Sequence, residues 1–511
     1  MTESERLLSR YLSRRAFLKG AGAGIVGLSL PSLLAGCGDS GSAKSPTATV
    51  TPTLTPSPSP SPTPTVPPLA VDPNIPWWLQ SDFAPVFDER TDFDLPVRGA
   101  IPPELNGLYV RNGSNPQKAD SPHWFFGDGM LHGVRLQNGR AAWYRNRYVH
   151  TPFYDQGLSF GDIPGLPTMG NNQSNVSCVW HGGRLLTSGE VGFPYEIDPT
   201  DLSTVGVFGF DGKLNTSFTA HPKIDPATGY LHFFGYWFVP PYLTYHVADA
   251  EGRIIHSQDI DVAASTMIHS FAITERDAIF WELPVLFDLE SAIKGMNPFK
   301  WQPDYGARIG VMPLGGMAAD IRWVEIEPCY VFHEVNAYRD GDDVVIDVCR
   351  HDTMFGPADL GQTDLRIHRW RVSTGAEQLT FHDEIVSDRR LELPTHDRRI
   401  TGRPHRYGWF ADTRYHPLTI DFAGTGLIDY RTGEVRTWDP GPARHANEAF
   451  FVPAGSGEGE GWLLTFVYDH VSDTSVLAIL DALNVEAGPV AEIEFPRRVP
   501  YGFHAVWVPE L

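Results

Sequence analysis

Four histidines stand in apolar segments that are typical of buried strands, and together they could hold a metal ion. The segments are FTAHPKID (His221), TMIHSFAIT (His269), YVFHEVNAY (His333) and YGFHAVWV (His504). Several buried imidazoles that face one another need a shared cation, because polar atoms buried without partners are costly. The alternative for each is a structural histidine bonded to a backbone carbonyl.

The four histidines are far apart in the chain, so no single helix or hairpin can bring them together. They can converge only where separate sheets point at a common axis, and a β-propeller has that arrangement. From spacing alone, a shared metal site remains a hypothesis.

The elements that would position these residues are short strands. From about residue 75 onward, runs such as DVVIDVCR and GWLLTFVYD alternate with turn signals such as RDGDD and YRTGE. We expect an all-β propeller of antiparallel sheets, with a pair of β-sandwiches as the alternative. No repeat is visible that would fix the number of blades. LPVLFDLESAIKGM, residues 283–296, predicts a short amphipathic helix, either part of the core or a patch that meets a membrane or an apolar substrate.

Composition narrows the classes of function. The formal net charge of −22 argues against nucleic-acid binding, which needs a positive surface. The sequence HEVNA at 333–337 lacks the second histidine of a zinc-protease helix, and no Gly-x-Ser-x-Gly elbow or phosphate loop occurs. Beyond Cys37, only Cys178, Cys329 and Cys349 remain, without the spacing of a thiolate metal site.

The N-terminus predicts export. SRRAFLK, with Arg14 and Arg15, precedes an apolar run that ends in LLAGC, as in a twin-arginine signal followed by a lipoprotein cleavage box. We therefore expect a signal at 1–37 with Cys37 lipidated, a Ser/Thr/Pro-rich disordered tether at 38–72, and a folded domain at 73–511. The predicted location is the outer face of a bacterial membrane. A plain N-terminal membrane anchor is the alternative.

At the histidine segments the chain resembles the carotenoid cleavage oxygenases, from about residue 80 to the C-terminus. The resemblance includes LNGLYVRNGSNP (105–116), HWFFGDGMLHGVRL (123–136), RYVHT (147–151) and GRPHRYGW (402–409), with the four histidine segments in the same order. It implies a seven-bladed β-propeller, a helical and loop cap over a substrate tunnel, and one Fe(II) per chain. The iron ligands would be His221, His269, His333 and His504.

The resemblance also implies three glutamates behind the ligands. Glu190 (TSGEVGFPYEID) would orient His269, Glu392 (RLELP) would orient His333, and Glu448 (HANEAFFVP) would orient His504. His221 would have no such partner. A carboxylate on the second nitrogen of a ligating imidazole fixes its tautomer and ring angle. Without the family, the sequence favours a strand surface residue at each of these positions, because nothing in the spacing selects these three glutamates from the rest.

The activity implied by the resemblance is cleavage of a conjugated C=C bond of a carotenoid or apocarotenoid by dioxygen, giving two carbonyl products. The candidates for the walls of the apolar tunnel are Trp124, Phe125, Phe126, Tyr236, Trp237 and Phe238, although the sequence favours plain core packing for each. One alternative is a stilbene-cleaving member of the family. Such members use a tyrosine and a lysine, but no lysine occurs here between Lys118 and Lys213. The other alternative is a non-catalytic, ligand-binding propeller lipoprotein.

Overall fold

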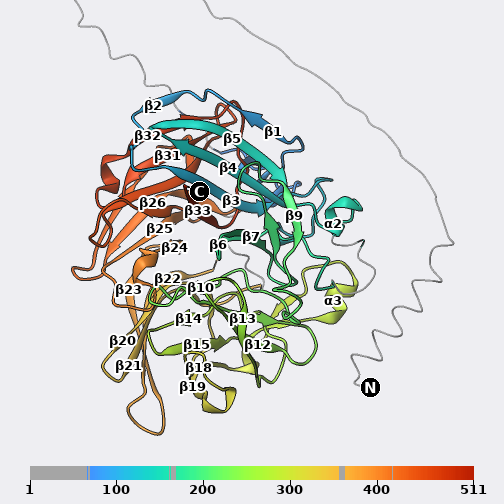
Figure 1. Ribbon diagram of the computed structural model, residues 1–511, viewed down its shortest axis with the longest axis vertical. Coiled ribbons are helices and arrows are strands. Elements are labelled where there is room, and N and C mark those ends of the chain that lie inside the picture. Colours follow the sequence, from blue (N-terminus) through green and yellow to red (C-terminus); the bar gives the residue numbers. More distant parts are fainter. Residues whose placement is uncertain are drawn as a thin grey trace, which may run out of the picture. The chain divides into compact units, whose positions relative to one another are not determined.

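Seven antiparallel sheets stand around a common axis as the blades of a β-propeller (Figure 1). The computed structural model describes residues 66, 69–159, 162, 168–355, 363–416 and 418–510, which belong to a compact unit from Pro67 to Leu511 except for Val66. The predicted signal and Cys37 lie outside the described residues. The predicted all-β fold is confirmed, and the propeller rather than the pair of sandwiches is the architecture.

Five of the blades are four-stranded and each uses one continuous stretch of chain. The second to fourth contain β6 (Ser177–His181), β7 (Arg184–Ser188), β8 (Tyr195–Ile197) and β9 (Thr204–Val207); β10 (Lys223–Ile224), β11 (Leu231–Tyr236), β12 (Leu243–Ala248) and β13 (Ile254–Ile260); and β14 (Ala272–Ile273), β15 (Asp277–Glu282), β18 (Ala307–Pro313) and β19 (Arg322–Ile326). The fifth and sixth contain β20 (Tyr330–Asp340), β21 (Asp343–His351), β22 (Leu365–Ser373) and β23 (Thr380–Ser387); and β24 (Leu391–Thr395), β25 (Tyr407–Arg414), β26 (Asp421–Asp429) and β27 (Glu434–Trp438).

The first and seventh blades join strands from both ends of the chain. The first contains β1 (Arg90–Asp92), β3 (Gly107–Ser114), β4 (Gly129–Gln137), β5 (Arg140–Tyr148) and the C-terminal β33 (Ala505–Pro509). The seventh contains β2 (Val97–Gly99), β28 (Arg444–Ala446), β29 (Phe450–Pro453), β30 (Gly461–Asp469), β31 (Thr474–Asp481) and β32 (Pro489–Glu494). The C-terminal β33 pairs with β3 in the first blade, and the N-terminal β2 pairs with β32 in the seventh. Two separate strand pairings therefore close the ring.

Local sequence explains the hairpins and the core. Between β4 and β5, Asn138 and Gly139 both have positive φ, as the two-residue turn of a twisted hairpin requires. The blades themselves bury apolar side chains on both faces, since each sheet packs against two neighbours. All eight residues of β3 are buried.

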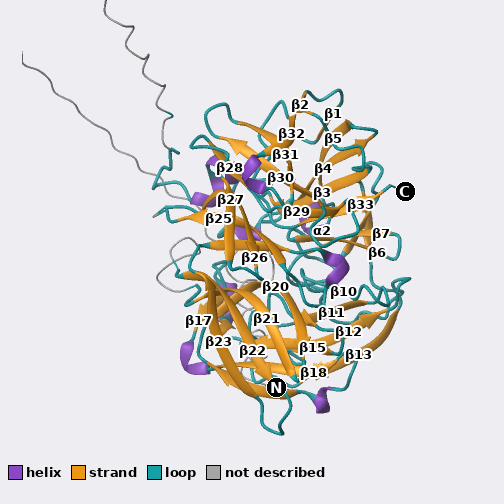
Figure 2. Cartoon of the chain, turned by 90° about the vertical axis from the view of Figure 1, so that its left-hand side faces the viewer, coloured by secondary structure: helices purple, strands orange, loops and turns teal. Residues whose placement is uncertain are grey.

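Among the residues that the structure describes, helices are few and short (Figure 2). They are α2 (Pro152–Asp155), α3 (Leu289–Ile293) and the 3-10 turns η2 (Trp77–Leu79), η3 (Ser81–Phe83), η4 (Trp124–Phe126), η6 (Pro303–Tyr305), η7 (Ala318–Asp320), η8 (Arg398–Ile400) and η9 (Val485–Ala487). No helix in the described ranges is long and apolar enough to cross a membrane.

The helix predicted over 283–296 is wrong for most of its length. Val285–Phe287 forms strand β16, which pairs with β17 (Phe299–Trp301). Only α3 is helical, and Asp288 caps it by accepting the N–H of Ser291 at 3.1 Å. The apolar run therefore belongs to a two-stranded sheet, and no apolar helix is available here to meet a membrane.

Candidate metal centre

Four different blades deliver the four histidines. His221, His269 and His504 stand just before β10, β14 and β33, and His333 lies within β20. Each of these strands is the edge strand of its sheet. Radially arranged sheets thus bring together side chains that are distant in sequence.

The backbone around His333 is irregular. The register between β20 and β21 shifts between Val331 and Glu334 and again between Glu334 and Asn336. Such bulges commonly occur beside active sites, where they re-aim a side chain. Here the bulge frees His333 from the regular alternation of the strand.

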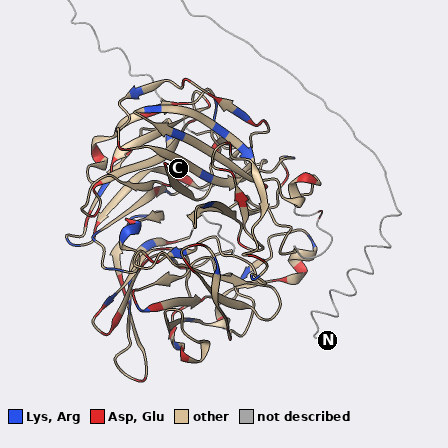
Figure 3. Ribbon diagram, in the orientation of Figure 1, with Lys and Arg blue, Asp and Glu red and all other residues tan. Residues whose placement is uncertain are grey.

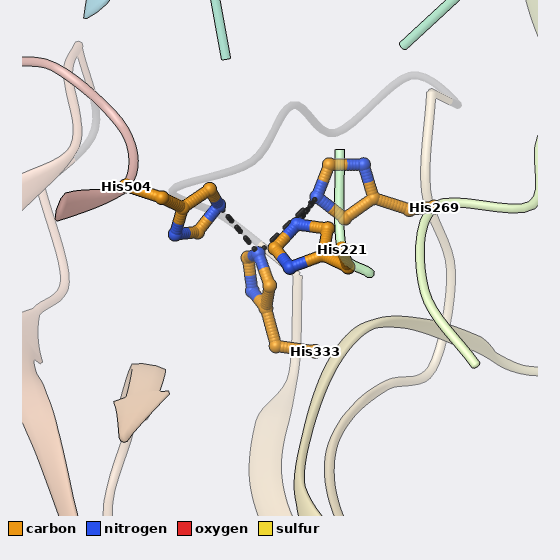
Figure 4. Close-up of side chains that lie close together, drawn as sticks. All are labelled: His221, His269, His333 and His504. Carbon is orange, nitrogen blue, oxygen red and sulfur yellow. Dashed lines mark hydrogen bonds between the residues drawn. The ribbon is translucent and has the colours of Figure 1, made fainter. Parts of the chain in front are cut away.

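The ring nitrogens of the four histidines point at one another (Figure 4). The Nε2 atom of His269 lies 2.9 Å from that of His221 and 3.2 Å from that of His333. The Nε2 atoms of His333 and His504 are 3.3 Å apart. All four potential ligand atoms lie within 4.8 Å of one another, and only His221 is less than fully buried.

Each of the three glutamates lies against the Nδ1 atom of one histidine. His333 Nδ1 is 2.6 Å from Glu392 Oε2, and His504 Nδ1 is 2.8 Å from Glu448 Oε1. His269 Nδ1 is 2.5 Å from Glu190 Oε1, although the angle of this contact is not that of a hydrogen bond. These are the pairings that the resemblance implies.

His221 differs from the other three, since no carboxylate of the described residues contacts its ring. Further contacts hold the glutamates in place. Tyr236 donates its hydroxyl hydrogen to Glu190 Oε2 at 2.9 Å, and the backbone N–H of Ala505 donates to Glu448 Oε2 at 2.8 Å.

The environment favours the neutral rings of His221 and His333 and the charged carboxylate of Glu392. Desolvation, with repulsion from the neighbouring imidazoles, lowers the pKa of His221 well below its ordinary value. Desolvation also lowers the pKa of His333 to about 3, although Glu392 opposes this. Burial by itself would raise the pKa of Glu392, but attraction to His333 and His351 and hydrogen bonds from both rings hold it below its usual range.

This donor set fits a metal ion. A neutral ring whose Nδ1–H faces a carboxylate presents a lone pair at Nε2. His269, His333 and His504 would then aim lone pairs at one another inside the protein, and a proton on His221 would satisfy only one contact. Neighbouring nitrogens at about 2.1 Å from a shared ion lie roughly 3.0–3.4 Å apart in octahedral or tetrahedral geometry, close to the separations found here. Imidazole suits Fe, Zn, Cu and Ni, so the donors alone do not select among these metals.

Comparison with known proteins decides the family. The sequence model of the family described as retinal pigment epithelial membrane protein (RPE65) matches residues 83–509. A carotenoid cleavage oxygenase of Mycobacterium tuberculosis is 35% identical over 84% of this chain and 97% of its own length. The chain belongs to the carotenoid cleavage oxygenase family. Iron is the metal of this family, and the four-histidine group fits a non-haem iron site.

Two further relatives show the range of chemistry in the carotenoid cleavage oxygenase family. A carotenoid 9,10(9',10')-cleavage dioxygenase of Crocus sativus is 35% identical over 85% of this chain and 89% of its own. The crystal structure of a lignostilbene dioxygenase from Pseudomonas brassicacearum superposes with a TM-score of 0.78 at 26% identity, covering 87% of this chain and all of that one. The family thus contains enzymes named for carotenoid and for stilbene substrates.

An apolar cavity of about 80 Å³ reaches the histidine cluster of this oxygenase at His269, His333 and His504. Two of the predicted tunnel residues, Trp124 and Phe125, line it. The other four do not. Tyr236 is buried against Glu190, Phe238 stacks on Phe287, and Phe126 and Trp237 also lie outside the lining.

Several residues of this site were missed by reasoning from the sequence. The apolar walls that it did not name include Val176, Phe332, Leu365, Leu393, Ile420, Phe422 and Phe503. His351 was missed as well; its Nε2 atom lies 3.2 Å from Glu392 Oε1, and its Nδ1 atom lies 2.9 Å from Thr363 Oγ1. Phe332 and Phe503 directly precede two of the histidines, and this adjacency was the available signal.

Proposed function

We propose that this protein is an Fe(II)-dependent dioxygenase, with one iron per chain, that cleaves a conjugated C=C bond of a carotenoid or apocarotenoid into two carbonyl products. The observation that carries the proposal is a cluster of four imidazoles, three of which line an apolar, aromatic cavity. The carotenoid cleavage dioxygenases among the relatives support the same substrate class.

The histidines and the glutamates of the site have different roles in the proposed reaction. His221, His269, His333 and His504 would hold the iron, which when bound supplies activation of dioxygen. Glu190, Glu392 and Glu448 fix the rings and offset the charge of the ion. No side chain is required to act as nucleophile or general base, in agreement with the absence of the corresponding sequence motifs.

The apolar walls orient the substrate and exclude water. Phe125, Phe332 and Phe503 surround the cavity beside the histidines, and they offer a polyene flat apolar contacts without hydrogen-bonding groups. The cavity is smaller than the roughly 300 Å³ or more of typical ligand pockets. Entry of a polyene therefore requires these rings to move apart.

A phenolic stilbene is the second candidate substrate, favoured by the structural match to the lignostilbene dioxygenase. Against it stands the absence of lysine between Lys118 and Lys213, the stretch in which stilbene-cleaving members would supply one. A phenolic substrate needs a polar group to bind its hydroxyl, whereas a carotenoid does not. We therefore rank carotenoids and apocarotenoids first.

The experiment is incubation of Fe(II)-loaded protein with a panel of carotenoids, apocarotenals and stilbenes, with products identified by mass. Cleavage of a carotenoid or apocarotenal into two carbonyl fragments is expected. Cleavage of stilbenes alone would support the second candidate. A loaded protein that cleaves no member of the panel would contradict both.

We further propose that the chain is exported by the twin-arginine route and anchored through lipid on Cys37, with residues 38–72 as a tether to the membrane surface. The support is the sequence SRRAFLK followed by LLAGC. Fractionation of cells that express the full chain tests this. Wild-type protein should be in the membrane fraction and Cys37→Ala should not be; equal partition of the two would refute lipid anchoring.

A further inference from the structure

A second cavity lies against the histidine cluster, and it is polar where the first is apolar. This polar chamber, as we call it, has a volume of about 390 Å³ and reaches His221, His333 and His504. Its walls include Lys223, His396, Arg398, Arg399 and Thr401. Cleavage of an apolar polyene makes no use of these groups.

Two of the three cations of the polar chamber are already paired. Lys223 forms an ion pair with Glu334, whose other oxygen accepts from Ser270 at 2.6 Å. Arg399 donates to Asp397 at 2.6 Å and also to the carbonyl oxygen of Gly455. Neither group has a free charge to offer a ligand.

Arg398 is different. Within the described part of the chain it makes no hydrogen bond or ion pair through its side chain. Its guanidinium carbon lies 4.6 Å from the centre of the Phe450 ring, a cation–π contact. The Arg398 side chain is exposed and lines the chamber, so its guanidinium is open to a ligand there. An ionised ligand would form charge-assisted hydrogen bonds with it.

The loop that carries Arg398 is fixed. Asp397 accepts the N–H of Arg399 at 3.1 Å and so caps η8. His396 Nε2 lies 2.9 Å from Thr401 Oγ1. Asn336 of β20 donates to the carbonyl oxygen of Ile400 at 3.2 Å. A ligand of Arg398 would therefore not have to order the backbone before binding.

We propose that the polar chamber binds a small oxyanion, of the carboxylate or phosphate class, at Arg398. A planar guanidinium matches the paired oxygens of such groups in a bidentate contact, which a halide cannot form. The chamber has room for the anion and its waters, since a water occupies about 30 Å³. His333 and His504 line both the polar chamber and the apolar cavity. The anion would lie in the polar chamber, so hydrophilic and apolar ligands would reach the histidine cluster through different cavities. This binding site goes beyond the proposed oxygenase function.

Isothermal titration calorimetry of the metal-loaded, full-chain protein tests the proposal, with inorganic phosphate and acetate titrated separately at constant ionic strength. Saturable binding of at least one is expected, and the one that binds more tightly identifies the class. Arg398→Gln should weaken it at least about tenfold, as expected for the loss of a charge-assisted bond. Arg366→Gln is the matched control, since it removes the same charge from an exposed ion pair with Asp364.

Absence of saturable binding of both anions to the wild-type protein would overturn the proposal. So would equal affinity in Arg398→Gln, because binding would then occur elsewhere, for example on the metal itself. If Arg398→Gln fails to fold by circular dichroism, Arg398→Lys decides: it keeps the charge but loses the fork, and an unchanged affinity for both anions would refute the bidentate contact. Calorimetry needs no turnover, so this result does not depend on whether the protein cleaves polyenes.

Discussion

Glu392 links the ring of His333 to the ring of His351 and to the backbone of Leu393. It takes contacts from the rings of His333 and His351 and accepts a hydrogen bond from the backbone N–H of Leu393. Glu392→Gln keeps the shape but loses the charge. We expect metal affinity or activity to fall about 10- to 100-fold, as for other groups that orient metal ligands.

Metal content after dialysis against a fixed free-metal concentration measures this effect. Glu434→Gln on β27 is the control, because Glu434 is an exposed strand residue. If Glu392→Gln retained metal and activity as fully as Glu434→Gln, the orienting role of Glu392 would be wrong.

Asp82 should make the stability of the folded protein depend on pH. Its carboxylate oxygens are buried without partners, and desolvation, only partly offset by attraction to His445, raises its pKa from 3.8 to about 7. Between these values the folded state holds a proton that the unfolded state has lost, so the free energy of unfolding falls as pH rises from about 4 through 7. Asp421 and Arg498 also act on this carboxyl, in opposite directions.

Asp82→Asn removes the titration and should flatten this loss of stability, by an amount on the order of a few kcal/mol. Urea unfolding at pH 5 and pH 8 measures the difference. If the pH dependence of the variant matches that of the wild type, Asp82 is not protonated in the folded protein.

The sequence indicated the candidate metal ligands by residue type and apolar context, and the resemblance to a family selected them. The walls of the apolar cavity were harder to predict. Phe422 and Ile420 lie far in sequence from all four clustered histidines, and only the packing of blades brings them to the site. Trp237 and Phe238 are aromatic residues in a matching segment that do not line this cavity.

The segment that precedes β33 shows how an element places a ligand. His504 is held by hydrogen bonds on both sides, from its N–H to Val176 and from the N–H of Asn112 to its carbonyl oxygen, each 3.1 Å long. Gly502 passes so close to β3 that an added Cβ would lie 2.6 Å from Arg111 Nε and 2.7 Å from the Asn112 carbonyl oxygen. No side chain larger than hydrogen fits there without a shift.

Gly502→Ala should therefore destabilise the fold by about 1–3 kcal/mol through overpacking and displace His504. Thermal unfolding and metal content together report both effects. Gly209→Ala is the control, since its Cβ would meet nothing closer than 4.0 Å. A Gly502→Ala protein as stable and as metal-rich as Gly209→Ala would show that the loop tolerates the side chain.

Residues 283–296 form a strand and a short helix instead of the predicted single helix. The segment has helical apolar spacing, but Val285–Phe287 finds a partner strand in Phe299–Trp301. Pro284, which lacks a backbone N–H, and the cap at Asp288 then leave room for only one short turn of helix. Pairing with β17 therefore overrode the local helical pattern, and periodicity alone could not tell a strand from a helix in this short apolar run.

At the scale of the molecule, the ends of the described chain close the ring. β33 adds to the first blade and β2 to the seventh, so the last residues serve both fold and site. Lys and Arg as well as Asp and Glu are spread over the blades (Figure 3). Strand content could be predicted from turn signals. The blade count could not, because the seven sheets differ in length and share no repeated sequence.

Comparing truncation after Phe503 with His504→Ala separates the role of β33 in closing the ring from the role of His504 in binding metal. The truncation removes His504 and β33 together, so we expect loss of metal and a large fall in melting temperature. His504→Ala should lose metal affinity while keeping the closed ring and most of the stability of the metal-free protein. Differential scanning calorimetry of both metal-free variants checks this; equal melting temperatures would mean that β33 contributes nothing to closure.

The proposed activity requires one iron among the four histidines. An anomalous difference map from crystals of the Fe(II)-loaded protein, collected at the iron edge, tests it directly. We predict a single peak per chain in contact with the Nε2 atoms of His221, His269, His333 and His504. The absence of a peak there, or a peak held by other residues, would contradict the account.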